Sequence, residues 1–305
     1  MLRLMLDAHP DLAIPPESHF IPRMWAIRAR FTRDGRLDGM ALAESLFPQF
    51  RFREWKIPAD AVRERLRAVE DPGFADVMEA FFLAYAAEHG ATRWGDKTPG
   101  YILEMELLAR LWPEARFVHL YRDGRDVALS FLQRGWARHL PEAAELWTKR
   151  TELGRRIGRG LGLERYLEVR YEDLVDRGER ELATICAFLD LDLRAEMFRY
   201  HERTGEILSA KEQRHHEHEA KPPTKGLRDW RTQMAPGDVA VFEAIAGETL
   251  ESFGYERAVP NPPAAARLRA GLGRAVTAAS RNGRRLRHRL MRLVRPRMLP
   301  PPRRW

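Results

Sequence analysis

Arg122 and Ser130 mark the stretch of this sequence that is best suited to hold a phosphate group. The preceding run, Phe117–Tyr121, is short and nearly all apolar, which is typical of a strand buried on both faces of a parallel sheet. Gly124 permits a turn, and Asp126 stands where it would cap the next helix. Arg122 is then expected at the carboxyl end of a strand, where open α/β sheets bind ligands. A guanidinium and a hydroxyl beside a helix N-terminus suit a phosphate, although a solvated arginine after an ordinary strand fits the same residues.

The rest of the sequence predicts the elements that would position these residues, in an α/β fold with a parallel sheet flanked by helices. Short strands are expected over residues 12–14, 92–94, 117–121 and 166–171. Apolar residues at helical spacing predict helices over residues 1–8, 24–31, 41–46, 61–69, 74–89, 102–111, 141–161 and 238–253. The helical region 24–91 is expected to form a lid or a substrate-facing layer, with its aromatic side chains mostly in the core.

The composition fits one substantial hydrophobic core or two small ones, because 44% of the 305 residues are hydrophobic and 31% are charged. Cys186 is the only cysteine, which excludes an intramolecular disulfide and disfavours a cysteine-based metal site. The sequence has no run of eighteen apolar residues and no signal-peptide pattern at its N-terminus. A cytoplasmic location is therefore expected.

The positive charge of this chain is concentrated at its C-terminus. Residues 264–305 hold thirteen arginines and no Asp, Glu or Lys, so the overall charge of +8 leaves residues 1–263 with a net charge of about −5. The basic pI is a property of this tail, and no nucleic-acid partner is expected for the folded body.

Several motifs of this sequence resemble those of sulfotransferases, and they follow one another in the same order as in that family. The sequence contains neither the Gly-x-x-x-x-Gly-Lys-Ser/Thr loop of ordinary P-loop kinases nor a Gly-x-Gly-x-x-Gly dinucleotide motif. Instead, Tyr-Arg-Asp-Gly-Arg-Asp-Val-Ala-Leu-Ser at 121–130 resembles the segment by which sulfotransferases hold the 3′-phosphate of 3′-phosphoadenosine 5′-phosphosulfate (PAPS). The motifs at 6–23, 95–99 and 169–175 extend the resemblance over roughly residues 1–255, and the first looks like the tyrosylprotein branch and its bacterial relatives. The implied fold is the P-loop-kinase-like sulfotransferase topology with its first strand missing.

The resemblance assigns five residues to the nucleotide. Arg122 and Ser130 match the ligands of the 3′-phosphate, and Tyr171 matches a tyrosine near the adenine. Lys225 and Gly226 look like the late loop that closes over the 3′-phosphate, although relatives often carry an arginine where this sequence has a threonine before the lysine. The implied co-substrate is PAPS, released as PAP, with no metal ion.

The resemblance also assigns two catalytic residues. Glu17 matches the carboxylate that acts as general base toward the acceptor hydroxyl, with His19 as a weaker candidate, although Glu17 could simply cap the following helix. Lys97, in Gly-Asp-Lys-Thr-Pro, would stabilise the charge on the leaving oxygen, unless it is only a solvated loop residue. The acceptor is a hydroxyl of a carbohydrate, a lipid, a phenol or a peptide tyrosine.

The first helix has no strand before it. In relatives the equivalent helix follows a strand and a Pro-Arg-Ser-Gly-Thr-Thr loop that cradles the 5′-phosphosulfate, and that loop would end immediately before Met1. The sequence is therefore expected to be a truncated or mis-started version of a longer protein. The alternative function is a non-catalytic protein that binds PAP or another anion or docks to a membrane.

Two domains are expected, a sulfotransferase domain over residues 1–258 and a basic tail over residues 259–305. In the tail, Leu268, Leu272 and Val276 recur every four residues among arginines, and the spacing is repeated at 286, 290 and 294. This pattern predicts either an amphipathic helix on an anionic membrane surface, which would place the protein at the inner face of the membrane, or a disordered basic tail. His215, His216 and His218 lack a carboxylate or cysteine at a diagnostic spacing, so no metal site is expected.

Overall fold

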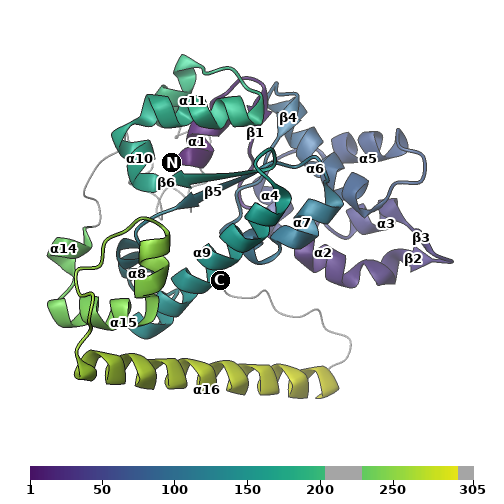
Figure 1. The fold of residues 1–305 in the computed structure, drawn as a ribbon. Coiled ribbons are helices and arrows are strands. Elements are labelled where there is room, and N and C mark those ends of the chain that lie inside the picture. The colour runs from purple at the N-terminus through teal and green to yellow at the C-terminus, as the bar shows by residue number, and fades with distance from the viewer. Residues whose placement is uncertain (203–228, 295–305) are drawn as a thin grey trace. The chain divides into compact units, whose positions relative to one another are not determined.

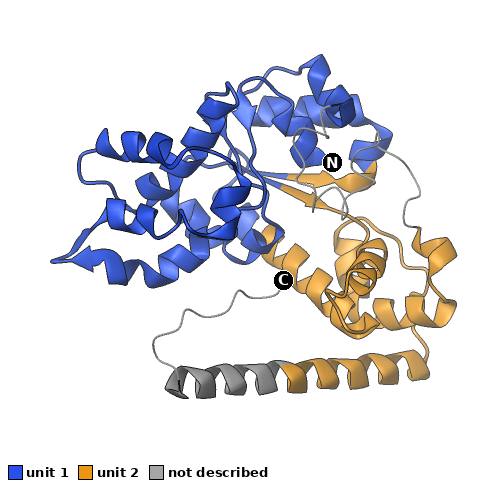
Figure 2. Ribbon diagram, turned by 180° about the vertical axis from the view of Figure 1, so that it is seen from behind, with its two compact units in different colours: residues 1–118, 157–167, 173–225 blue, residues 119–156, 168–172, 226–305 orange. Residues whose placement is uncertain are grey.

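Short strands alternate with longer helices in the computed structural model, which describes residues 1–202 and 229–294 and the side chains up to residue 280 (Figure 1). The protein is a mixed α/β protein that is mostly helical. The chain divides into two compact units, residues 1–118, 157–167 and 173–225 in the first and residues 119–156, 168–172 and 226–305 in the second (Figure 2). Each unit has a hydrophobic cluster of its own.

A parallel strand pair organises the first unit. Strand β1 (Leu12–Ala13) pairs with β4 (Arg93–Trp94), with Leu12 opposite Arg93 and Ala13 opposite Trp94. Since the strands are parallel, their carboxyl ends lie at one edge, and the loops that carry Glu17 and Lys97 leave from that edge. The pair is short because Pro15 and Pro16 have no amide hydrogen with which to continue the pairing.

Helices surround this pair in the first unit. They are α1 (Leu2–Asp7), α2 (Ile21–Ile27), η1 (Arg28–Phe31), α3 (Gly39–Glu44), α4 (Phe50–Glu54), α5 (Ala59–Arg67), α6 (Phe74–Glu88), η2 (Pro99–Leu103) and α7 (Met105–Leu111), with a β2 (Thr32–Arg33) to β3 (Arg36–Leu37) hairpin between η1 and α3. Helix α6 begins at a capping box, in which the Asp76 carboxylate accepts a hydrogen bond from the Gly73 amide at 2.8 Å. Its apolar face and neighbouring helices bury Phe20, Phe81 and Phe82. The prediction that the aromatic residues of 24–91 form core is confirmed for most of them, whereas Phe50 is exposed.

The middle of the chain runs through both units. It comprises β5 (Phe117–Tyr121), α8 (Gly124–Gln133), α9 (Leu140–Leu161), β6 (Tyr166–Arg170), α10 (Tyr171–Asp176), α11 (Gly178–Leu189) and η3 (Ala195–Glu202). Strand β5 pairs with β6, and the Phe117 amide donates to the Arg165 carbonyl at 2.8 Å. The carboxyl end of β5 leads directly to Arg122, as the sequence predicts.

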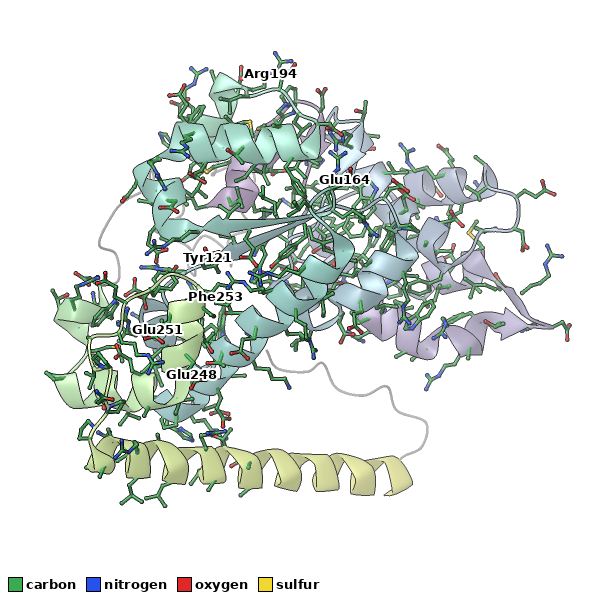
Figure 3. All side chains as sticks on the ribbon, in the orientation of Figure 1. Tyr121, Glu164, Arg194, Glu248, Glu251 and Phe253 are labelled. Atoms are coloured by element: carbon green, nitrogen blue, oxygen red, sulfur yellow. The ribbon has the colours of Figure 1, made fainter. Side chains whose placement is uncertain are left out.

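The second unit is built around the indole of Trp147. After the residues that are not described, the chain forms α14 (Trp230–Gln233), α15 (Pro236–Ser252) and α16 (Ala264–Val294). Trp147 packs with Phe242 of α15 and Phe131 of α8 in one cluster. Tyr121 of β5 meets Phe253, just after α15, with ring centroids 5.0 Å apart (Figure 3). A Cβ on Gly124 would lie 2.4 Å from the Trp147 ring, so this glycine is needed for close packing.

The expected sheet differs from the one that forms. Within residues 1–202 and 229–294, the strands pair two by two, as β1–β4, β2–β3 and β5–β6, and do not join into one flanked sheet. The prediction that β5 is buried on both faces is wrong, because its residues are half-buried and Leu120 reaches 36% exposure. Two-residue strands offer too few backbone groups to join further partners.

Helix α16 turns one face to α15 and another to solvent. Ala266 and Ala270 are buried in a cluster with Ala240 and Val241 of α15. Leu268 and Leu272 are 65% and 61% exposed. The start of the predicted tail is thus an ordered helix packed on α15, while the domain boundary at residue 258 remains a prediction.

Candidate functional site

Glu17 and Lys97 form an ion pair at the edge of the β1–β4 pair. The Lys97 Nζ lies 2.5 Å from the Glu17 Oε1, although the two residues are 80 positions apart in the sequence. The side chain of Glu17 is 24% exposed and that of Lys97 is 42% exposed, so both are open to a ligand. Glu17 does not cap α2, whose first turn follows Phe20 without a side-chain cap.

His19 is the second partner of the Glu17 carboxylate, with its Nε2 2.8 Å from Oε2. Burial by itself would raise the pKa of Glu17, but the hydrogen bond from His19 and the charge of Lys97 outweigh it and lower the pKa to about 2. The carboxylate is therefore ionised at neutral pH, and it is a weak base as long as both partners hold it. His19 has a φ of 54°, in the left-handed region that non-glycine residues rarely occupy and that is frequent at functional sites.

A buried hydrogen-bond network holds the two loops together. The Ser18 hydroxyl donates to the Asp96 carboxylate, and the Tyr101 hydroxyl lies 2.7 Å from the Ser18 Oγ. The Ser18 amide donates to the Thr98 hydroxyl at 3.1 Å. Burial raises the pKa of Asp96, against the opposing effect of its hydrogen bonds. Since Ser18 adjoins Glu17 and Asp96 adjoins Lys97, this network fixes the positions of both charged residues.

Sequence reasoning missed Ser18, Asp96 and Tyr101. The signal was available in part, because Ser18 and Asp96 directly adjoin the two predicted catalytic residues. Their pairing could not be read from the sequence, since it depends on the register of the β1–β4 pair.

Arg122 and Tyr171 meet in the second unit. The Arg122 guanidinium lies 4.6 Å from the centre of the Tyr171 ring, and its Nη2 is 2.7 Å from the Asp126 Oδ2. The Arg122 side chain is 21% exposed. Burial raises the pKa of Asp126, although the charge of Arg122 opposes this shift. Ser130 lies half-buried about two turns into α8. We call Arg122, Ser130 and Tyr171 the Arg122 group.

The predicted helix cap is corrected by one turn. Asp123, and not Asp126, caps α8, since its carboxylate accepts from the Arg125 amide at 2.9 Å. Asp126 accepts instead from Arg122 and from the Trp230 amide, the latter at 2.9 Å. Gly124 therefore lies within the first turn of α8, and its role is close packing with Trp147 rather than the turn itself.

A buried cation joins the start of α8 to later segments. Arg125 is 1% exposed and pairs with Asp123 and with Glu243 of α15, each at 2.7 Å. Its guanidinium lies 3.7 Å from the Trp230 ring centre, and the Trp230 indole donates to Asp123 at 3.1 Å. We call these four residues the Arg125 anchor. Lys225 and Gly226 lie outside the described residues, but Trp230, five positions after Lys225, is fixed against α8.

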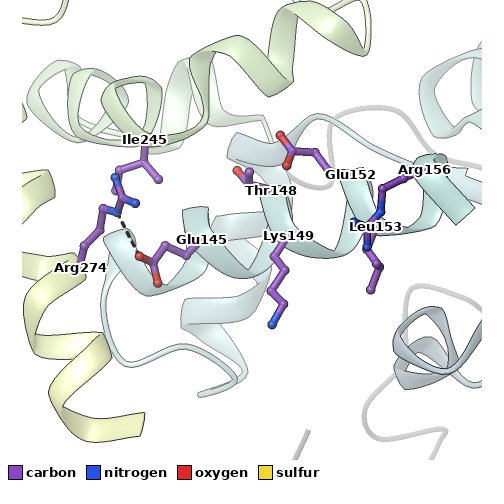
Figure 4. A pocket seen from close by; sticks show the side chains of 8 residues that line it. All are labelled: Glu145, Thr148, Lys149, Glu152, Leu153, Arg156, Ile245 and Arg274. Carbon is purple, nitrogen blue, oxygen red and sulfur yellow. Dashed lines mark hydrogen bonds and ion pairs between the residues drawn. The ribbon is translucent and has the colours of Figure 1, made fainter. Parts of the chain in front are cut away.

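A separate hollow of about 550 Å³ lies on α9, α15 and α16 (Figure 4). Its lining includes Glu145, Lys149, Glu152 and Arg274, and Arg274 donates to Glu145 at 3.2 Å. None of the predicted site residues lines it.

The part of the chain that the structure describes has neither a metal-binding cluster nor a helix that could span a membrane. Among the side chains that the structure describes, those of residues 1–202 and 229–280, there is no group of three or more His, Cys, Asp or Glu arranged to hold a metal ion. The histidines at 215, 216 and 218 fall outside these ranges. No described helix combines the length and the apolar character needed to cross a bilayer.

The chain is similar to several proteins that are named protein-tyrosine sulfotransferases. It is 28% identical over 275 residues to protein-tyrosine sulfotransferase 2 of Gallus gallus, covering 86% of this chain and 67% of that protein. It is 26% identical over 274 residues to protein-tyrosine sulfotransferase 1 of Danio rerio, covering 86% and 70%.

Solved structures share the fold. The sulfotransferase domain of the Synechococcus PCC 7002 olefin synthase superposes with a TM-score of 0.58 at 24% identity, covering 84% of this chain and 90% of that domain. The sulfotransferase domain of the curacin biosynthetic pathway gives 0.52 at 19% identity, covering 84% and 93%. The sulfotransferase family model matches residues 1–195, the stretch that carries Glu17, Lys97 and the Arg122 group. This match over most of the chain, in agreement with the fold, shows that the protein belongs to the sulfotransferase family.

Proposed function

We propose that this protein transfers a sulfuryl group from PAPS to a hydroxyl of an acceptor. The observation that supports this most directly is the Glu17–Lys97 ion pair, which joins a carboxylate and an ammonium group from two distant loops. Family membership implies a sulfuryl transferase, and the family generally uses PAPS.

In the proposed reaction, Glu17 accepts the proton of the acceptor hydroxyl as its oxygen attacks sulfur. The new sulfur–oxygen bond forms while the bond from sulfur to the bridging phosphate oxygen breaks, and the charge that develops on that oxygen is stabilised by Lys97. Lys97 must then leave the Glu17 carboxylate, and the loss of this charge makes Glu17 a stronger base. Separation of the ion pair would thus couple binding of the donor to activation of the base.

The Arg122 group is proposed to bind the 3′-phosphate and adenine of PAPS. A guanidinium donates two parallel hydrogen bonds to a phosphate, and Arg122 is held in place by Asp126 and the Tyr171 ring. Ser130 adds a hydroxyl from α8, and Lys225 and Gly226 are proposed to complete the site. The Arg125 anchor supports the last assignment, since Trp230 ties the end of their segment to α8.

Calorimetric titration of the 305-residue chain with PAP tests the nucleotide site. Micromolar binding that is abolished by Arg122→Ala is the expected result, with Arg156→Gln on the exposed part of α9 as control. Absence of PAP binding by the unaltered chain would refute the proposal. Transfer of radiolabelled sulfate should be tested first on tyrosine-containing peptides, because the relatives are named protein-tyrosine sulfotransferases. Carbohydrate, lipid and phenol acceptors follow, and PAP binding without transfer to any of them would favour the non-catalytic alternative.

The exposed face of α16 favours a second function, contact with an anionic membrane surface. Leu268, Leu272 and Val276 are 65%, 61% and 54% exposed, on the side of the helix away from the alanines that pack on α15. Residues 264–294 contain arginines and no acidic residue, a composition that complements anionic lipid headgroups. An apolar row flanked by arginines is typical of helices that lie in the plane of a membrane surface.

Cosedimentation with vesicles of phosphatidylglycerol and phosphatidylcholine tests this contact. We expect binding at low salt that weakens at high salt, and loss of binding in Leu272→Glu. Ala278→Glu adds the same charge to the exposed surface of the helix outside the apolar row, and should bind nearly as well as the unaltered chain. Equal binding by the two variants, or no binding by the unaltered chain, would contradict the membrane function.

A further inference from the structure

Arg150 is a half-buried cation of α9 without a counter-charge. Its Nε is fully buried and has no hydrogen-bond acceptor in the structure. Its guanidinium carbon lies 5.7 Å from the centre of the Phe131 ring. Burial is the sole cause that lowers the pKa of Arg150, with no opposing contribution from a carboxylate.

Three other buried or half-buried arginines of the same unit have such a partner. Arg125 pairs with Asp123 and Glu243, Arg122 with Asp126, and Arg155 with Glu168 at 2.6 Å. A desolvated charge without a partner is destabilising, and proteins seldom retain one without a ligand or a function. Arg150 therefore has the properties expected of a residue that binds an anion.

The two residues that link Arg150 to the Arg122 group are Phe131, next to Ser130 in the sequence, and Trp147, which touches Arg122. Phe131, which the guanidinium faces, directly follows Ser130 on α8. Trp147, one turn before Arg150 on α9, donates from its indole to the Arg122 carbonyl at 3.1 Å. The same short segments thus carry Arg122, Ser130 and Arg150.

We propose that Arg150 is a further ligand of the nucleotide 3′-phosphate, and that its guanidinium binds an oxygen of that group. The proposal rests on the proposed function, because it assumes that the Arg122 group holds this phosphate. Bound phosphate would supply the counter-charge that Arg150 lacks. The ligand chemistry is that of a tetrahedral oxyanion, which a free sulfate shares.

Calorimetry with PAP and with adenosine 5′-monophosphate tests whether Arg150 binds the 3′-phosphate. Arg150→Gln should weaken PAP binding by about ten-fold or more, the usual effect of losing a charged hydrogen bond. The affinity for adenosine 5′-monophosphate, which has no 3′-phosphate, should stay unchanged. Arg156→Gln, on the same helix but exposed, should leave both affinities within about two-fold of the unaltered chain. Equal PAP affinity of Arg150→Gln and the unaltered chain would overturn the inference while leaving the proposed function intact.

Thermal melting supplies a readout that does not depend on PAP. In the absence of ligand, Arg150→Gln should melt at the same temperature as the unaltered chain or higher, because the removed charge has no partner. Sodium sulfate should raise the melting temperature of the unaltered chain more than that of the variant. If the chain binds no PAP but sulfate still raises its melting temperature more than that of the variant, the proposed function fails and the anion site at Arg150 stands. If sulfate raises both melting temperatures equally and PAP does not bind, the proposed function and the anion site both fail. Should Arg150→Gln not fold, Arg150→Lys, which keeps the charge but not the planar fork, provides the same comparisons.

Discussion

Replacement of Glu17 by glutamine should change the acid stability of the protein in a defined pH range. The pKa of Glu17 falls from its ordinary value of 4.5 to about 2 in the folded protein. A carboxyl whose pKa is lowered by folding stabilises the protein above its unfolded pKa, and this contribution is lost as the pH falls through the folded pKa. At about 1.4 kcal/mol per pH unit, the difference corresponds to about 3 kcal/mol. The side chain is only 24% exposed, so solvent screening reduces this value modestly.

The assay is urea unfolding, followed by circular dichroism, from pH 7 to pH 2.5. The unaltered chain should be more stable than Glu17→Gln by up to about 3 kcal/mol at pH 7, and the difference should shrink steadily below about pH 4.5. Glu88→Gln, an exposed position of the same unit, should show no such trend. A difference between the unaltered chain and Glu17→Gln that stays constant over this pH range would refute the assignment of Lys97 and His19 as the groups that lower the pKa.

Further substitutions test the remaining contacts. Lys97→Met should lower the rate of sulfuryl transfer by about 10²-fold or more while leaving PAP affinity within about ten-fold, as measured by radiolabelled transfer and calorimetry; an unchanged rate would contradict its role. Gly124→Ala should lower the melting temperature through a loss of about 1–3 kcal/mol, because its Cβ would lie 2.4 Å from the Trp147 ring. Glu243→Gln should cost about 3 kcal/mol in urea unfolding, because it leaves Arg125 with one carboxylate fewer in a buried site; a neutral result would show that Asp123 alone suffices.

Three of the candidate site residues have a local signature in the sequence, because each follows a strand end. Arg122 directly follows β5, Tyr171 directly follows β6, and Lys97 lies three residues after β4. Their types and the motifs around them were sufficient to single them out. The contact between Glu17 and Lys97 could not be predicted, because it depends on the parallel register of β1 and β4. Each of these strands has only two residues, which is too short for a distinct hydrophobic pattern.

Other features have no local signature. Asp123 and Asp126 are both suitable caps, and in the structure Asp123 caps α8 while Asp126 accepts hydrogen bonds from Arg122 and the distant Trp230 amide. Arg150 resembles any other helix arginine, since the sequence does not show that its neighbours carry no counter-charge. The single predicted sheet failed for a related reason, because apolar runs indicate strands but not how many partners each strand finds.

The Arg125 anchor has a consequence for how the length of this chain can vary. Trp230 is fixed to Asp123 and Asp126, and Glu243 accepts from the Ala258 amide at 3.0 Å and from the Val259 amide at 2.7 Å. Insertions or deletions upstream of Asp229 therefore end at a point that is already tied to α8. The start of α14 and the packing of α15 are thus set by these contacts with α8 and with residues 258 and 259, and not by the length of chain before Asp229.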